Sequence, residues 1–205
     1  DATLSADIIA FEDGDFVTLA EAAQNKPFEA TTLIAVALQL VDIVAAVHRA
    51  GVVHKDISSA NILLSGPEQQ PWLIDFDLAT NFAEERPGFI QPQEIAGTLA
   101  YIAPEQTGRT GRAVDQRADL YALGAVFYEL AIGHPPFDGG HGDALQLIHE
   151  ILAQAPAPPA DLNPQVPKGL SDILLRLLEK EPDRRYQSAE GLKVGDPVVL
   201  MGFSV

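Results

Sequence analysis

The residues of this chain that could do chemistry together lie in two short stretches, 52–64 and 72–77. In the first stretch, Asp56 is followed five residues later by Asn61, and both stand between short runs rich in β-branched residues, which predict strands. The second stretch is a short apolar strand that ends in Asp75. Mg²⁺ prefers hard oxygen ligands, few of them from the protein and the rest from phosphates and water. Asp56, Asn61 and Asp75 therefore predict a phosphoryl-transfer site.

Three motifs carry a resemblance to a known family, and they are His54-Lys55-Asp56 with Asn61, Asp75-Phe76-Asp77, and Ala103-Pro104-Glu105. In this order and at this spacing they resemble the catalytic loop, the metal loop and the end of the activation segment of a protein kinase. The chain is similar, more closely, to the kinase domain that opens very large bacterial signalling proteins, where an ATPase module and a sensor histidine kinase follow. Segments 54–57, 97–109 and 185–189 carry this closer resemblance, which covers about residues 7–192.

The resemblance implies a role in phosphate transfer for several residues. Asp56 would orient the attacking hydroxyl and accept its proton, while Asn61 and Asp75 would hold Mg²⁺ on the phosphates of ATP. Thr98 matches the position that marks serine/threonine kinases and would hydrogen-bond toward Asp56. The adenine of ATP would be held by the backbone of a hinge formed by Phe11, Glu12 and Asp13.

Five further residues would support the site: His54, Lys55, Glu105, Asp119 and Arg185. His54 would pack and hydrogen-bond inside the core, next to Lys55 of the same motif. Asp119 would accept hydrogen bonds from the catalytic-loop backbone, although its place near the start of a helix also suits an N-cap. Glu105 and Arg185 would form a buried bidentate pair that fixes the end of the activation segment, because the arginine fork matches a carboxylate.

Two positions depart from the family pattern. Ser58, which we keep among the catalytic candidates, stands where serine/threonine kinases commonly have a lysine, and Ala60 fills the alternative cation position, so one γ-phosphate contact is missing. Asp77 replaces the usual glycine, which removes the freedom to reach positive φ and adds a second candidate carboxylate ligand. Three functions therefore stay open. They are a serine/threonine protein kinase, a pseudokinase that binds without turnover, and a small-molecule phosphotransferase. Ser58 and Asp77 favour the small-molecule enzyme, whereas the 103–105 motif, Arg185 and the helix that starts at Asp119 oppose it.

Composition limits the partners. The 205 residues are 47% hydrophobic, which is enough for one substantial core, and their net charge of −16 argues against nucleic acid or an anionic membrane surface. Cysteine is absent and no signal-peptide pattern appears, so we expect a cytoplasmic protein. Because the chain starts at Asp1, we interpret it as a fragment of a longer protein with further domains. We expect it to act on a protein substrate and to transfer phosphate poorly by itself.

The sequence predicts a mainly α fold with a few short β-strands (α+β), a kinase-like C-terminal lobe with the small lobe largely absent. Residues 1–16 would form the last small-lobe strand and the hinge, 17–192 the large lobe, and 193–205 a divergent tail. Apolar patterns predict helices over 31–47, 119–130, 143–151 and 170–177. Residues 156–167 should be an extended connector. The run 31–47 also suits a membrane span, but Gln39 and Asp42 favour a buried core helix.

Overall fold

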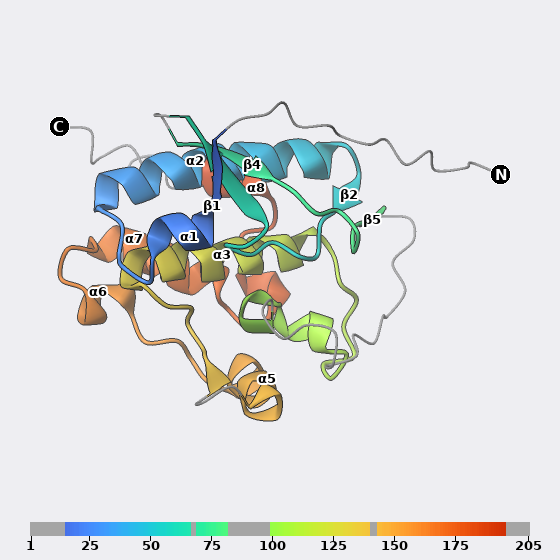
Figure 1. Cartoon of the computed structure of the whole chain (residues 1–205). Coiled ribbons are helices and arrows are strands. Elements are labelled where there is room, and N and C mark those ends of the chain that lie inside the picture. The colour runs from blue at the N-terminus through green and yellow to red at the C-terminus, as the bar shows by residue number, and fades with distance from the viewer. Residues whose placement is uncertain (1–14, 67–68, 82–98, 140–142, 196–205) are drawn as a thin grey trace.

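The structure is a computed structural model that describes residues 15–66, 69–81, 99–139 and 143–195. It consists of helices with a few short strands, as the sequence predicted (Figure 1). The strands are β1 (Phe16–Thr18), β2 (Val52–Val53), β3 (Ile62–Ser65), β4 (Gln70–Leu73) and β5 (Thr80–Asn81). The α-helices are α1 (Leu19–Ala23), α2 (Ala30–Arg49), α3 (Gln116–Ile132), α5 (Ala144–Ala153), α6 (Pro159–Leu162), α7 (Lys168–Leu177) and α8 (Ala189–Gly195). The 3-10 turns are η2 (Leu99–Tyr101), η3 (Pro104–Thr107) and η4 (Pro182–Arg184).

Helix α3 lies at the centre of the molecule, with α2, α6, α7 and η2 packed around it (Figure 1). Every residue from 118 to 131 is buried, so this helix has no solvent-facing side. The side chain of Asp115 caps α3 by accepting from the backbone N–H of Arg117. The N-cap role that the sequence also suggested for Asp119 is therefore wrong, because Asp115 caps this helix. A β-carbon on Gly124 would lie 2.6 Å from Cβ of Leu177, so the glycine lets α7 approach closely.

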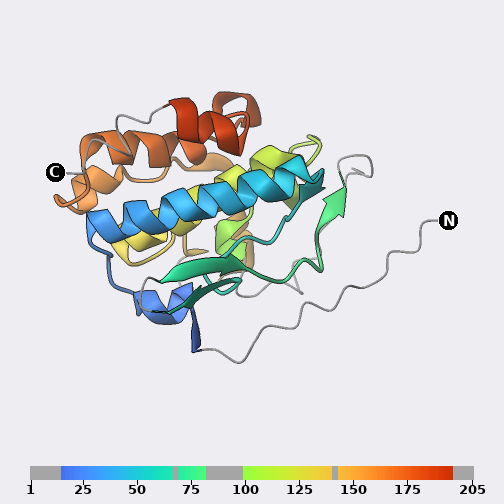
Figure 2. The ribbon, with the colours of Figure 1, turned by 90° about the horizontal axis from the view of Figure 1, so that it is seen from above.

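Helix α2 contains neither proline nor glycine over its 20 residues, and it ends where Gly51 takes a left-handed conformation with φ of +78°. By length and composition this helix could cross a membrane, but a core helix passes the same test. One face of α2, with Leu33, Leu40 and Val44, is buried in the main core. Figure 2 shows the strands β3 and β4 on one side of α2 and the helices α7 and α8 on the other.

A three-stranded antiparallel sheet in the order β1-β3-β4 covers α2. In β3, Ile62 and Leu64 are buried and alternate with half-buried residues, which fits a strand with one face on the core. The sequence analysis missed β1 because it ended the predicted hinge at residue 16. The expected division into 1–16, 17–192 and 193–205 stays a prediction, since residues 1–14 and 196–205 lie outside the described residues.

Helix α5 packs against η2 and η3 rather than against the main core. Its N-cap is Asp143, as the sequence predicted, and its buried face joins a separate group that we call the α5 cluster. The α5 cluster consists of Leu99, Ile102, Phe137, Leu147, Ile148 and Ile151. The segment 156–167, predicted to be extended, contains the short helix α6, where proline stands at the first helical position.

Candidate active site

The loop between β2 and β3 holds the Asp56 carboxylate in a fixed position. Nδ2 of Asn61 donates to Oδ2 of Asp56 at 2.8 Å and to the backbone oxygen of Asp56 at 2.9 Å. The next residue, Ile57, is buried in the main core and anchors the loop from below. Because the amide nitrogen of Asn61 serves Asp56, its oxygen Oδ1 is the atom left to bind a cation.

His54 is fully buried, and its hydrogen bonds define its tautomer. The backbone N–H of Asp56 donates to Nδ1 at 3.2 Å, and Nε2 lies 3.1 Å from the carbonyl oxygen of Ile74, which can only accept. Nε2 therefore carries the hydrogen. Burial is the main cause that lowers the pKa of His54, so the ring is neutral at pH 7. The ring also contacts Phe76, with the two ring centroids 4.4 Å apart.

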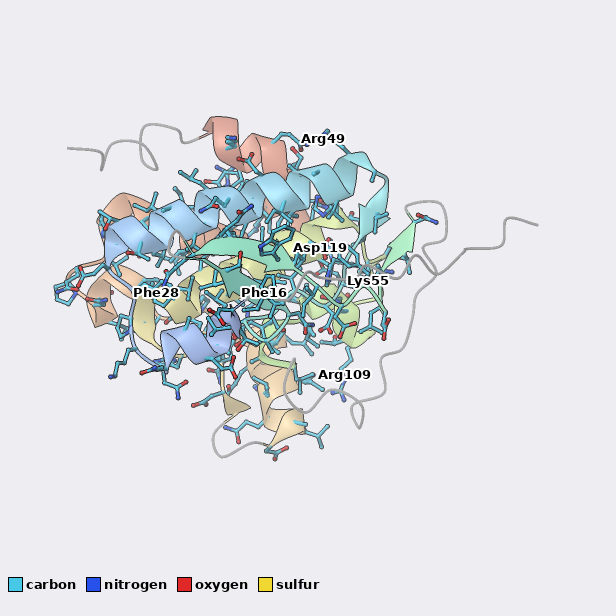
Figure 3. All side chains as sticks on the ribbon, turned by 45° about the horizontal axis from the view of Figure 1, so that its top comes forward. Phe16, Phe28, Arg49, Lys55, Arg109 and Asp119 are labelled. Atoms are coloured by element: carbon cyan, nitrogen blue, oxygen red, sulfur yellow. The ribbon has the colours of Figure 1, made fainter. Side chains whose placement is uncertain are left out.

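Asp119 connects the central helix α3 to the loop between β2 and β3, which we call the catalytic loop after the motif that it resembles. Its carboxylate is fully buried and accepts from the backbone N–H of His54 at 2.9 Å and of Lys55 at 2.8 Å, while Nε2 of His48 lies 2.8 Å from Oδ2. Lys55 has a left-handed φ of +68°, which costs a non-glycine residue about 1–2 kcal/mol. Asp119 offsets this strain through its bond to Lys55, and Figure 3 shows the two residues side by side. Asp119 thus accepts from two backbone N–H groups of this loop, and its role in supporting a catalytic site stays a prediction.

The end of β4 brings Asp75 to the same loop. The backbone N–H of Ile74 donates to the carbonyl oxygen of Asn61 at 3.0 Å, so Asp75 follows directly on a residue bonded to Asn61. Asp75 is exposed and has φ of +64°, and its Oδ1 accepts from the backbone N–H of Asp77 at 3.3 Å. The residue with positive φ is Asp75 and not Asp77, so aspartate in place of glycine at position 77 introduces no left-handed strain.

The carboxylates of this site do not form a metal cage by themselves. Across the described residues, no group of three or more His, Cys, Asp or Glu side chains could hold a metal ion. Mg²⁺ fits such an open site, because it is usually bound by one or two carboxylates together with phosphates and water. The oxygen donors available are Oδ1 of Asn61 and the carboxylates of Asp75 and Asp77.

Two adjacent serines on the catalytic loop differ in their partners. Ser58 is 1% exposed, and its Oγ has no hydrogen-bond partner within the described part of the chain. Oγ of Ser59 lies 2.8 Å from the hydroxyl of Tyr101, which donates to Oε2 of Glu129 at 2.8 Å. This buried chain joins the catalytic loop, η2 and helix α3. Sequence reasoning missed it, although a glutamate inside the apolar run of α3 was a usable signal.

Glu105 and Arg185 meet in a buried bidentate pair, 80 residues apart in sequence. Nη1 and Nη2 of Arg185 donate to the two carboxylate oxygens at 2.7 and 2.8 Å, and both side chains are at most 1% exposed. Next to this pair, Gln106 is buried and donates from Nε2 to the carbonyl oxygen of Lys55 at 2.8 Å. Gln106 was not among the predicted residues, yet it joins the turn η3 to the catalytic loop.

Four predicted site residues lie outside the described residues, so their positions stay predictions: Phe11, Glu12, Asp13 and Thr98. The remaining ones gather at one end of α3. Asp56 and Asn61 are joined by a hydrogen bond, and Asp75 directly follows Ile74, whose N–H donates to the carbonyl oxygen of Asn61. Lys55 and Asp119 support this loop, whereas Phe28 lies at the opposite end of α3 (Figure 3), where its N–H donates to the carbonyl of Leu130.

This chain belongs to the protein kinase domain family, whose model matches residues 8–194. It is 39% identical over 184 residues to the serine/threonine-protein kinase PkaA of Streptomyces coelicolor, a match that covers 89% of this chain and 32% of the relative. It is 42% identical over 146 residues to the DNA damage-responsive serine/threonine-protein kinase RqkA of Deinococcus radiodurans, covering 71% of this chain and 21% of that protein.

The serine/threonine-protein kinase PknB of Mycolicibacterium smegmatis is 33% identical over 189 residues, which is 90% of this chain and 29% of the relative. The chain thus spans about a third or less of the length of the curated relatives that it matches. Family membership agrees with the helical fold and with the motif order.

Proposed function

We propose that this chain is the large lobe of a bacterial serine/threonine protein kinase, which transfers the γ-phosphate of ATP to a hydroxyl group of a protein substrate. The observation that carries the proposal is the fixed Asp56 carboxylate, held by Asn61 in a loop that Asp119 binds from the core. Relatives named as serine/threonine kinases along most of this chain support the same function.

Asp56 would act as the base that orients the substrate hydroxyl and accepts its proton. Its Oδ2 accepts from Asn61 at 2.8 Å, which fixes the orientation of the carboxylate toward the hydroxyl. The neutral, Nε2-protonated His54 holds the loop backbone and does not compete for this proton. Catalysis by such a site is mostly positioning and electrostatic stabilisation.

Asn61 and Asp75 would hold Mg²⁺, with Asp77 as a second carboxylate near Asp75. Mg²⁺ bound there would neutralise the negative charge of the ATP phosphates. The backbone of Phe11, Glu12 and Asp13 would bind the adenine. The site thus needs ATP and Mg²⁺, as protein kinases generally do.

The protein substrate would meet the turns η2 and η3, whose end the Glu105–Arg185 pair fixes. Thr98, just before η2, would position the substrate hydroxyl together with Asp56. Because the relatives are about three times longer, we propose that this lobe works in a longer cytoplasmic signalling protein with further domains. The hybrid kinase with an ATPase module and a sensor histidine kinase is the parent that the motifs favour.

A second candidate function is a pseudokinase, a binding module without turnover. Ser58 favours it, because this position supplies no cation to the γ-phosphate and its buried hydroxyl has no partner among the described residues. A small-molecule phosphotransferase of the same fold is favoured by Ser58 and Asp77. The buried pair of Glu105 and Arg185 disfavours it, since the pair supports a segment suited to protein substrates.

The test is Asp56→Asn in the full-length protein, with Asp172→Asn on the exposed face of α7 as the matched control. We expect Asp56→Asn to reduce phosphate transfer to a protein substrate by about 10²–10⁴-fold, with an unchanged circular dichroism spectrum. The control should leave transfer unchanged. Binding of Mg-ATP by wild type without any transfer would establish the pseudokinase. Transfer to an aminoglycoside or choline, but not to protein, would establish the small-molecule enzyme.

A further inference from the structure

A cavity of about 250 Å³ opens at the C-terminal end of α7, where the chain between α5 and α6 passes over it. Its lining residues are Ala155, Pro156, Leu175, Leu178, Glu179 and Lys180. None of these residues belongs to the candidate active site. The volume equals that of roughly eight water molecules, so it would suit a ligand of roughly eight non-hydrogen atoms.

The lining of the cavity is mostly apolar, and Lys180 is the one cation among the lining residues. Nζ of Lys180 lies 4.1 Å from the ring centroid of Phe137 and 3.4 Å from the carbonyl oxygen of Glu150. Among the described residues Lys180 forms no ion pair with a carboxylate. Burial, and then the charge of Arg185, lower the pKa of Lys180 to about 8, against a smaller opposite effect of Glu179. A second anion beside Lys180 would therefore stabilise its protonated form.

Two residues that line the cavity, Glu179 and Lys180, also support the segment that we propose to bind protein substrates. The carbonyl oxygens of Glu179 and Lys180 accept from Arg185 at 2.7 and 3.1 Å, and the same guanidinium holds Glu105. On its other side, Lys180 contacts Phe137, a member of the α5 cluster together with Leu99 and Ile102. A ligand in this cavity would thus contact residues that bond Arg185 on one side and Phe137 of the α5 cluster on the other, and both of these hold residues 99–105.

We propose that this cavity binds a small aliphatic monocarboxylate, with the carboxylate on Lys180 and the aliphatic tail against Ala155, Pro156, Leu175 and Leu178. Charge complementarity at the edge and the apolar wall define this ligand class. Lys180 is the one cation and Glu179 the one anion among the lining residues, so one carboxylate of a ligand can pair with Lys180, whereas a second would meet only Glu179 and be repelled. The proposal goes beyond kinase activity and does not depend on it.

The test is ligand-observed NMR titration of the 205-residue chain with hexanoate, which has eight non-hydrogen atoms. We expect a dissociation constant on the order of 1 mM, as for a small fragment. Hexanamide, which keeps the shape without the charge, should bind at least tenfold more weakly, and so should the dicarboxylate adipate. Hexanoate binding should also weaken as the pH rises above about 8, because Lys180 then loses its proton.

Two variants and one control locate the ligand. Lys180→Met keeps the length of the side chain and should weaken hexanoate binding at least tenfold. Ala155→Trp places a large side chain in the cavity from an exposed loop position and should abolish binding without disturbing the core. Lys168→Met, at the exposed start of the same helix, should change nothing. Equal binding of hexanoate and hexanamide, or unchanged binding by both cavity variants, would refute the proposal, whatever the outcome of the phosphate-transfer assay.

Discussion

Among the arginine and lysine residues of the described chain, Arg185 is the one whose replacement should destabilise the fold most. We consider its replacement with methionine. All five N–H donors of Arg185 have partners: two bond the carboxylate of Glu105, and three bond the carbonyl oxygens of Arg117, Glu179 and Lys180. Methionine fills a similar length and satisfies none of these acceptors. The substitution therefore separates the hydrogen bonds and the charge from the packing.

The expected loss of stability follows from the buried groups that Arg185 leaves without a partner. Glu105 is 2% exposed, and a buried charge that loses its partner costs about 3–5 kcal/mol. Each carbonyl that loses its donor adds about 1 kcal/mol unless water reaches it. With three such carbonyls, Arg185→Met should therefore lower the free energy of unfolding by about 6–8 kcal/mol, a large part of the 5–15 kcal/mol that is typical of a domain. Glu105→Gln should cost less, about 3 kcal/mol, because Arg185 keeps its three carbonyl partners.

Urea denaturation followed by circular dichroism at pH 7 measures both variants and their combination. We expect the double variant to lose clearly less than the sum of the two single losses, since the second change removes a charge that has already lost its partner. Lys168→Met, which breaks an exposed ion pair with Asp172, is the control and should stay within about 0.5 kcal/mol. A loss below 1 kcal/mol for Arg185→Met would show that the buried network contributes little to stability, and additive single losses would show that Glu105 and Arg185 are not coupled.

Three smaller perturbations test other parts of the structure. Ser58→Ala should leave thermal stability unchanged or raise it, because its hydroxyl has no partner in the described chain, whereas Ser59→Ala should cost about 1 kcal/mol for its lost hydrogen bond. Gly124→Ala should cost about 1–3 kcal/mol in urea denaturation by overpacking against α7, while Gly191→Ala in α8, where the nearest contact is 3.3 Å away, should be tolerated. Burial lowers the pKa of His54, so below pH 6.5 the unfolded chain binds a proton that the folded chain does not. Stability should therefore fall as the pH drops through 6.5, and the urea midpoint of His54→Gln should fall less over the same range.

Motif order in the sequence was enough to predict the fold class and the neighbours within the catalytic loop. The spacing of Asp56 and Asn61 places both on one short loop, and the structure joins them directly. Helices α5 and α7 were also predicted, because each has one buried and one exposed face and so carries a helical period. The pair of Glu105 and Arg185 came only from the family resemblance, since no local pattern links residues 80 positions apart.

The parts that sequence reasoning missed depend on contacts distant in sequence. Helix α3 is buried all round, so its apolar pattern predicted a helix but could not show which neighbours surround each face. Asp115 and Asp119 both stand near its start, and only the distant catalytic loop decides that Asp119 turns inward while Asp115 caps. Gln106 likewise has a local partner, Ala103, and a distant one, Lys55, and the sequence shows only that a polar residue follows the 103–105 motif.

The separation of the α5 cluster from the main core has a consequence for how the molecule opens. Six buried side chains hold α5 against residues 99–102, whereas the catalytic loop is anchored in the much larger core through Ile57. Local opening of a small apolar group exposes little surface and needs less free energy than global unfolding. Helix α5 can therefore detach by itself, because residues 101–105 stay bonded to the main core through the Tyr101–Glu129 hydrogen bond and the Glu105–Arg185 pair. Asp56 and Asn61 would keep their geometry. The chain would then contain two units that melt separately, with its chemistry in the more stable one.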